Sequence, residues 1–139
     1  MVKALSEMQC LGIIHRFNTA EEQVAELKQF ALDDTPYKAA AIGINQNTEI
    51  TRLKSLADFG VKIICIDIAN GGSKTIEKFL NKVNNLIREY DIKIIAGNVA
   101  SSETTKFLIN LNVDAVRVGI GNGAMCSTSI KSGIGIGQV

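Results

Sequence analysis

The chain has 139 residues, of which 46% are hydrophobic and 21% charged, and its formal net charge is +1. This length accommodates one domain with a substantial core rather than two ordinary ones, and the composition excludes a disordered chain. The near balance of charge excludes the basic surface on which nucleic-acid binding depends. Three cysteines without a CxxC pair fit a reducing compartment better than a disulfide framework or a zinc site. No apolar run reaches the ~18 residues that cross a bilayer, and the N-terminus does not resemble a signal peptide, so we expect a cytoplasmic protein with no membrane partner.

The chain begins with a helix-like segment at 2–8, and five apolar, β-branched runs follow along the sequence. These predicted strands cover 11–15, 39–44, 62–68, 93–98 and 115–120. Helical patterns separate them: Thr19 and Glu22 have the spacing of a capping box, and an apolar stripe with helical spacing runs from Ile76 to Ile87. The strands recur every ~23–30 residues, about the length of one βα unit, and their lack of alternation implies burial on both faces. The pattern predicts a single α/β domain with a parallel sheet.

Polar or glycine-rich clusters come directly after the predicted strands. They are His15-Arg16, 43–45, 67–73, Gly97-Asn98 and 119–128. In parallel α/β folds the carboxyl ends of the strands form the face that binds ligands. We therefore expect these clusters to converge on one site.

Four of these polar side chains have a structural interpretation beside a functional one. Asp67 ends an apolar strand, where a buried carboxylate needs a hydrogen-bond partner. That partner could be a hydroxyl or amide of a ligand, or Asp67 could cap the next helix. Asn98 could bond a ligand or satisfy loop amides, and Arg16 could clamp a phosphate or lie solvated on the surface. His15 is the only histidine, so a metal site or a histidine-based triad is hard to build, and a structural role is favoured.

Cys126 follows a loop in which glycine stands at every second position from Gly119 to Gly123. Glycine lets the backbone approach a ligand closely, and successive amides and carbonyls in such turns can bind an anion or a cation. A thiol in this setting is a candidate nucleophile, although a buried cysteine more often acts as a small hydrophobe. Cys65 and Cys10 lie in or beside apolar runs, and both are expected to be inert members of the core.

Four short motifs follow one another along almost the whole chain. They are IHRF at 14–17 with EEQ at 21–23, DIANGGS at 67–73, AGNV at 96–99 and VGIGNGAMCST at 118–128. In order and spacing they resemble the motifs of the purine nucleotide oxidoreductases that include IMP dehydrogenase and GMP reductase. That family has a (β/α)₈ fold, so the resemblance implies a partial TIM barrel of about five parallel βα units, with residues 1–139 as one partial catalytic domain.

The resemblance also implies roles for individual residues. Cys126 would be the catalytic nucleophile that attacks C2 of the purine, and Thr128 a catalytic hydroxyl that helps proton transfer. Asn98, Gly123 and Ala124 would bind the nucleotide substrate, GMP or IMP. Residues that match the nicotinamide-cofactor segments, for NADPH or NAD, are Arg16, Asp67, Ile68, Ala69, Ile120 and Gly121. The backbone carbonyls of Gly121, Gly123 and Cys126 would hold a monovalent cation, usually K⁺.

Two features favour a GMP reductase, which converts GMP to IMP and ammonia, over an IMP dehydrogenase, which converts IMP to XMP. The stretch 30–37 leaves no room for the CBS-type regulatory insertion of most family dehydrogenases, and Asn70-Gly71 is closer to the reductase A-N-G than to the dehydrogenase A-H-G. The sequence also departs from the family pattern. Ala124 replaces a serine that contacts the nucleotide phosphate, Asn122 a proline, Ser129 an arginine or similar residue, and Gly72 a histidine or tyrosine.

A complete barrel typically needs ~250 residues. We therefore expect a fragment, a split-gene product or a degenerate relative, which would leave two unpaired sheet edges open to association. One expected partner is the purine mononucleotide. The expected protein partner is either further copies of the chain, in a homo-oligomer that is a tetramer in the family, or a complementing fragment. A non-catalytic binding module is the alternative from another functional class.

Overall fold

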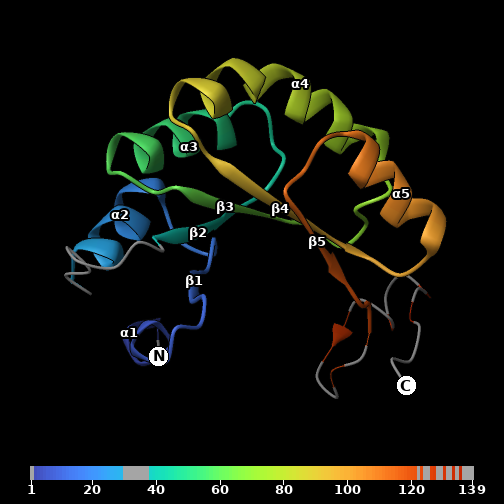
Figure 1. The fold of residues 1–139 in the computed structure, drawn as a ribbon, viewed down its shortest axis with the longest axis horizontal. Coiled ribbons are helices and arrows are strands. Elements are labelled where there is room, and N and C mark those ends of the chain that lie inside the picture. The colour runs from blue at the N-terminus through green and yellow to red at the C-terminus, as the bar shows by residue number, and fades with distance from the viewer. Residues whose placement is uncertain are drawn as a thin grey trace.

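The computed structural model describes residues 2–29 and 38–121 and, beyond them, residues 123, 126, 127, 130, 133 and 135. Helices and strands alternate along these residues (Figure 1). The order is α1 (Val2–Glu7), β1 (Ile13–Ile14), α2 (Ala20–Gln29), β2 (Ala39–Ile42), α3 (Glu49–Asp58), β3 (Ile63–Asp67), α4 (Lys74–Glu89), β4 (Lys93–Val99), α5 (Ser102–Asn110) and β5 (Ala115–Val118). None of the described helices is long and apolar enough to cross a membrane.

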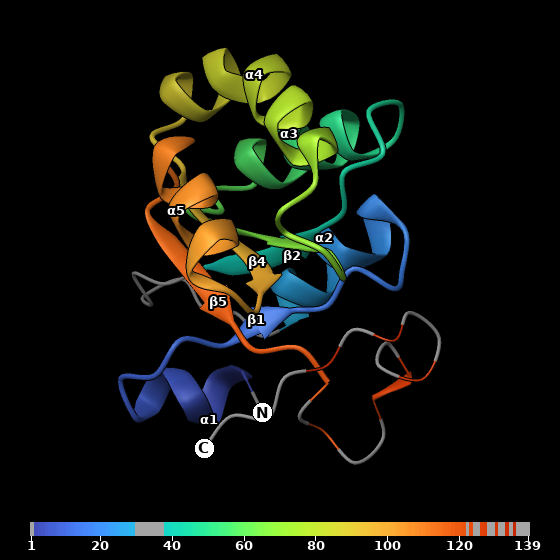
Figure 2. The same ribbon diagram turned by 90° about the vertical axis from the view of Figure 1, so that its right-hand side faces the viewer.

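The described strands form one sheet in which they follow one another in chain order, β1-β2-β3-β4-β5, and every neighbouring pair is parallel. The sheet curves, and helices α2 to α5 cover its convex face, whereas α1 lies on the other side of β1 (Figures 1 and 2). Sequential parallel strands with outer helices are the arrangement of a (β/α)₈ barrel. The described residues contain five parallel strands and the helices that follow the first four, which confirms the predicted partial barrel of about five parallel βα units.

The core lies between the sheet and its outer helices. Successive strand residues point to opposite faces, so Ile64 and Ile66 of β3 turn to the helices, where they pack in one cluster with Leu53 of α3 and Phe79 of α4. The stripe predicted from Ile76 onward supplies the buried face of α4. This cluster holds the sheet rigid beneath the loops that follow its strands.

The opposite, concave face of the sheet carries apolar side chains along the strands and polar ones at their carboxyl ends. The strand register aligns Ala41, Cys65 and Ile95 in one row and places Asp67 beside Gly97, which in turn is paired with Arg117. The second row lies at the carboxyl ends of the strands, where a ligand site is expected.

The predicted strands are correct in place, but four of them are shorter than predicted, whereas β4 extends one residue beyond the predicted end, to Val99. The runs at 39–44 and 115–120 stop as strands at Ile42 and Val118, because the next residues turn into the carboxyl-end loops. The run at 11–15 is reduced to Ile13–Ile14, and a β-carbon on Gly12 would lie 2.9 Å from the Cα of Val2 in α1. The stretch 30–37, on which the absence of an insertion was inferred, lies outside the described residues.

Candidate active site

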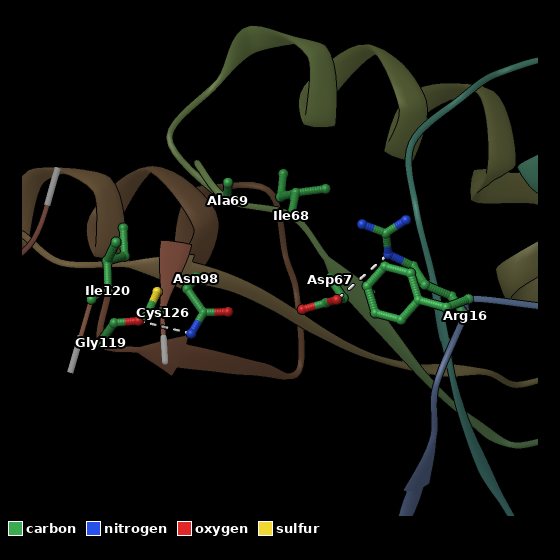
Figure 3. Close-up of a pocket in the computed structure, with 10 residues that line it drawn as sticks. Arg16, Asp67, Ile68, Ala69, Asn98, Gly119, Ile120 and Cys126 are labelled. Carbon is green, nitrogen blue, oxygen red and sulfur yellow. Dashed lines mark hydrogen bonds and ion pairs between the residues drawn. The ribbon is translucent and has the colours of Figure 1, made fainter. Parts of the chain in front are cut away.

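One pocket of about 280 Å³ opens at the carboxyl ends of the strands (Figure 3). Its lining comes from the carboxyl ends of β3 and β4 and from the loops after β1, β3 and β5, as the sequence clusters predict. The lining residues are Arg16, Phe17, Asp67, Ile68, Ala69, Asn98, Gly119, Ile120, Gly121 and Cys126. The fold thus brings together eight of the residues predicted for the site, although they are spread over more than a hundred positions of the sequence.

The described residues that line the pocket divide between two ends. Arg16 and Asp67 lie at one end, Cys126 and Asn98 at the other, and Ile68 and Ala69 lie along one side between them (Figure 3). Gly123 is described but is not among the lining residues; its carbonyl accepts a hydrogen bond from the Cys126 amide at 2.9 Å. Thr128 and Ala124, together with the departures at Asn122 and Ser129, lie outside the described residues.

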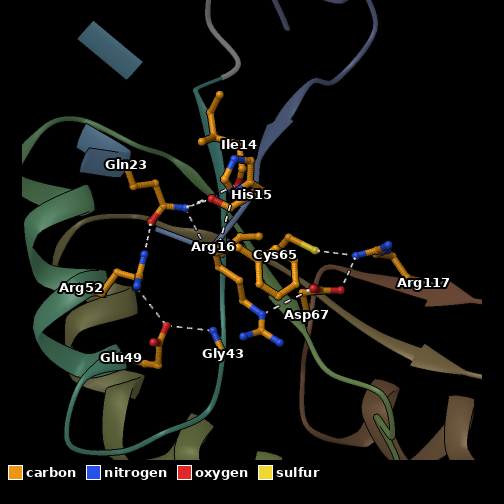
Figure 4. Close-up of polar contacts among 12 residues, drawn as sticks. Ile14, His15, Arg16, Gln23, Gly43, Glu49, Arg52, Cys65, Asp67 and Arg117 are labelled. Atoms are coloured by element: carbon orange, nitrogen blue, oxygen red, sulfur yellow. Dashed lines mark hydrogen bonds and ion pairs between the residues drawn. The ribbon is translucent and has the colours of Figure 1, made fainter. Parts of the chain in front are cut away.

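Asp67 joins two arginines at one end of the pocket (Figure 4). Its Oδ1 accepts a hydrogen bond from Arg117 at 3.0 Å, and its Oδ2 lies 3.5 Å from Nε of Arg16. Helix α4 is capped instead by Ser73, whose Oγ accepts from the Thr75 amide. The capping alternative for Asp67 is therefore wrong, and the carboxylate is held at the pocket by charge pairing.

Arg16 is neither a freely solvated surface residue nor a fully satisfied one. Its guanidinium lies 5.1 Å from the ring centroid of Phe17, which is 79% exposed. Its Nε is buried without a hydrogen-bond partner among the described residues, since the 3.5 Å approach to Asp67 is an ion pair without hydrogen-bond geometry. A buried donor of this kind favours a ligand with an acceptor oxygen, such as a phosphate or a hydroxyl.

Asn98 enters the pocket because strand β4 is irregular there. The pairing with β5 shifts register between Gly97 and Val99, and such a bulge re-aims the side chain of the extra residue. The Asn98 amide donates to the carbonyl of Gly119 at 2.8 Å, which ties β4 to the start of the Cys126 loop. Asn98 thus satisfies a loop group, and its side chain also faces the pocket.

The loop before Cys126 requires glycine at two described positions. Gly119 and Gly121 have φ values of 124° and 83°, a region that residues with a β-carbon rarely adopt. Cys126 itself is half-buried, and its thiol lies at the same end of the pocket as Asn98 (Figure 3). Cys65, by contrast, is fully buried in β3, and burial raises the pKa of its thiol. The structure therefore separates one cysteine at the pocket from one inside the sheet. Cys10 is exposed, so the prediction that it belongs to the core is wrong.

A buried polar network behind the pocket was not predicted from the sequence. Gln23 of α2 is completely buried, and its amide donates to the carbonyls of His15 and Ala41 at 2.9 Å each. Its Oε1 accepts from Arg52 at 2.9 Å, and Arg52 also pairs with Glu49 at 3.3 Å (Figure 4). The network fixes the loop that carries Arg16 against β2. The EEQ motif contained its only sequence signal.

Further contacts complete this network at the first two loops. Glu49 accepts from the Gly43 amide at 2.8 Å, and Arg52 donates to the carbonyl of Asn18 at 2.7 Å. His15 has a structural role, as the sequence favoured, because its Nδ1 accepts from the amide of Phe17 at 3.1 Å. These contacts order the backbone on both sides of Arg16.

No group of three or more histidine, cysteine, aspartate or glutamate side chains within the described part of the chain could hold a metal ion. A monovalent cation would therefore depend on backbone carbonyls, for which the left-handed turn at Gly121 is suited. The end of the pocket with Arg16 and Asp67 could hold a nicotinamide cofactor, because the Arg16 Nε has no hydrogen-bond partner among the described residues and Ile68 and Ala69 add apolar lining.

A family model described as the IMP dehydrogenase / GMP reductase domain matches residues 1–139. The chain belongs to this family. Inosine-5'-monophosphate dehydrogenase from Halalkalibacterium halodurans is 44% identical over 101 residues, which are 72% of this chain and 20% of that protein. The enzyme of the same name from Staphylococcus aureus is 39% identical over 121 residues, 85% of this chain and 24% of its own.

A solved member of the family has the same fold. The crystal structure of inosine 5' monophosphate dehydrogenase from Legionella pneumophila superposes with a TM-score of 0.83 at 31% identity, over 99% of this chain and 40% of that one. This family member therefore spans about a fifth to a quarter of the curated relatives that it matches, and less than half of the solved one.

Proposed function

We propose that the chain is part of a purine nucleotide oxidoreductase of the GMP reductase type, acting through Cys126. The observation that carries the proposal is the single pocket in which Cys126 and Asn98 share one end while Asp67 and Arg16 share the other. A nucleotide base at the first end and a cofactor at the second would place two reactants in adjacent positions. Such alignment lowers the barrier because the reactants need not be brought together at the moment of reaction.

At the substrate end, the Cys126 thiolate would attack C2 of GMP. The C2–N bond breaks, ammonia leaves with a proton, and a thioimidate joins C2 to sulfur; this covalent step divides a difficult substitution into two easier ones. Asn98, Gly123 and Ala124 would contact the nucleotide, and the Thr128 hydroxyl would assist proton transfer. When hydride has reached C2, the C–S bond breaks and IMP is released with the free thiol.

At the cofactor end, NADPH would supply the hydride that replaces the amino group at C2. The buried Nε of Arg16 would face a charged or hydroxyl-bearing part of the cofactor, and Asp67 would accept a hydrogen bond from a cofactor hydroxyl. Ile68, Ala69, Ile120 and Gly121 would form the walls. The carbonyls of Gly121, Gly123 and Cys126 would hold K⁺ and stabilise the loop.

The second candidate is an IMP dehydrogenase with NAD, which the names of the similar proteins favour. Asn70, which favours the reductase by its residue type, has a local role that needs no reductase, because its Oδ1 accepts from the Gly72 amide at 3.0 Å and shapes its own turn. The missing side chain at Gly72 is also explained locally, since a β-carbon there would lie 2.5 Å from a methyl group of Thr104.

The remaining strands of the barrel would come from further chain or from a complementing polypeptide. Among the described strands, β1 and β5 form the two edges of the sheet, which fits either source and also fits a homo-oligomer as the working form. Experiments on its activity therefore use the protein in the form in which it is purified, with its oligomeric state measured.

Intact-protein mass spectrometry tests the proposal and separates the two reactions. With GMP alone, the reductase forms a thioimidate on Cys126 and releases one equivalent of ammonia, because ammonia leaves before hydride transfer. With IMP, an adduct requires NAD, because the hydride must leave first. Cys126→Ala abolishes either adduct, while Cys10→Ala, at an exposed cysteine outside the pocket lining, serves as the matched control. The absence of an adduct in both mixtures would contradict the proposal.

A further inference from the structure

Arg117 reaches the pocket's carboxylate from two strands away. It lies on β5, Asp67 lies on β3, and the register places Gly97 of β4 between them. Its NH1 nevertheless donates to Asp67 Oδ1 at 3.0 Å and lies 3.4 Å from the sulfur of Cys65 (Figure 4). A long side chain therefore crosses the middle strand along the concave face of the sheet.

Gly97 makes this crossing possible. A β-carbon at position 97 would lie 2.6 Å from both the Cβ and the carbonyl oxygen of Arg117, and 3.2 Å from its Cα. These are backbone and near-backbone atoms, so rotation of a flexible side chain could not relieve the clash. Any larger residue at position 97 would push β5, and with it the first atoms of the Arg117 side chain, away from Asp67.

The two arginines beside Asp67 are not equivalent. Arg117 makes a hydrogen bond of good length to the Asp67 carboxylate and a second hydrogen bond to the sulfur of Cys65, so its guanidinium is held at two points on β3. Arg16 approaches at 3.5 Å without hydrogen-bond geometry, and its buried Nε has no hydrogen-bond partner among the described residues.

We propose that Arg117 is a positioning residue, which crosses β4 over Gly97 and holds the Asp67 carboxylate in place. Arg16 is then the arginine that gives up its ion pair with Asp67 and contacts a nicotinamide cofactor instead. This inference rests on the proposed function, because Asp67 and Arg16 are the polar groups at the cofactor end. A carboxylate that is already oriented can accept a hydrogen bond from a cofactor hydroxyl without first losing conformational freedom. The entropy cost of binding is therefore lower, and the affinity for the cofactor is higher.

Steady-state kinetics of the purified protein with NADPH and GMP test the positioning role. We expect Arg117→Met to raise the KM for NADPH about tenfold, the effect of losing one charge-assisted hydrogen bond that orients a ligand group. The KM for GMP and adduct formation on Cys126 stay unchanged, and Arg117→Lys restores part of the loss because it keeps the charge without the planar fork. Arg88→Met, at an exposed arginine of α4, is the matched control. Equal effects on both substrates, or none, would overturn the proposal.

A measurement without ligand separates this inference from the proposed function. In urea unfolding, a double-mutant cycle between Arg117→Met and Asp67→Asn should show a coupling of about threefold in the unfolding equilibrium constant, modest because the pair is partly exposed. The cycle between Arg16→Met and Asp67→Asn should show less. If wild type forms no adduct and turns over neither nucleotide, the proposed function fails, and the cycle still decides whether Arg117 holds Asp67. Coupling that is absent, or larger for Arg16, would overturn the inference.

Discussion

Replacing Gln23 with leucine tests whether the buried network behind the pocket holds the first two loops together. Leucine fills similar space but has no polar group, so the substitution leaves two carbonyls, of His15 and Ala41, and one N–H of Arg52 without their partner. Gln23 is completely buried and the Arg52 side chain is 11% exposed, so water replaces these bonds poorly. Each buried polar group left unpaired costs about 1–3 kcal/mol, and we expect a total loss of about 3 kcal/mol.

Urea unfolding followed by circular dichroism measures this loss. A domain of this size has a total stability of about 5–15 kcal/mol, so the change is large, and at a slope of about 2 kcal/mol per molar it lowers the midpoint by about 1.5 M. Gln29→Leu is the matched control, because Gln29 is the same residue type in the same helix but exposed. We expect its midpoint to stay within about 0.3 M of wild type, as for most surface substitutions.

The comparison between the two glutamines decides the interpretation. If Gln23→Leu shifts the midpoint no further than Gln29→Leu does, the network contributes nothing to the fold, and the argument that it orders the Arg16 loop fails with it. If the slope changes rather than the midpoint, the substitution has altered compactness and not the stability of the native contacts.

Three further predictions concern α4, α5 and the sheet. The hydrogen bond from Tyr90 to Asp58 raises the pKa of the Tyr90 phenol. The stabilising contribution of this hydrogen bond is therefore complete below pH ~10 and is lost as the pH rises through the folded-state pKa. As the pH is raised from ~9 to ~11, the unfolding midpoint of Tyr90→Phe should fall less than that of wild type. Ser101→Ala removes one half of the capping box with Thr104 and should lower the free energy of unfolding by about 1 kcal/mol in urea, whereas an unchanged midpoint would exclude a capping contribution. In native protein a thiol reagent should modify Cys65 last, because burial shields the thiol and raises its pKa; labelling as fast as at an exposed surface thiol would contradict that burial.

The fold was predictable because each βα unit carries its own local signals. The buried runs around Ile64 and Ile94 are apolar on both faces, which indicates a parallel strand covered by helices. The capping box at Thr19 is present as predicted, since the Glu22 amide donates to the Thr19 hydroxyl and the Thr19 amide donates to the Glu22 carboxylate. Helix starts and buried strands depend on neighbours within a few residues, and a sequence displays those directly.

The ion pairs and hydrogen bonds of the site were not predictable in the same way. Gln23 and Arg52 are 29 positions apart, and Arg117 meets Asp67 across 50. Such partners follow from strand register, and a shift of one residue would turn every side chain of a strand to the other face. In the sequence, Arg117 looks like a polar interruption of an apolar run. Its function as a partner of Asp67 emerges only when Gly97 is placed between them.

The two networks meet at the loop after β1, and this has a consequence for how the pocket is built. Gln23 holds the backbone at His15, while the side chain of the next residue, Arg16, faces Asp67. Asp67 is in turn held from β5, the strand that leads into the loop of Cys126. The backbone of Arg16 is therefore fixed, while its guanidinium keeps a long ion pair with Asp67 and a contact with the exposed ring of Phe17, so a ligand can draw the guanidinium away without disturbing the loop. Because the backbone is fixed, the pocket has a defined shape before a ligand binds. Because the Arg16 guanidinium can change partners, its positive charge can move toward the ligand on binding.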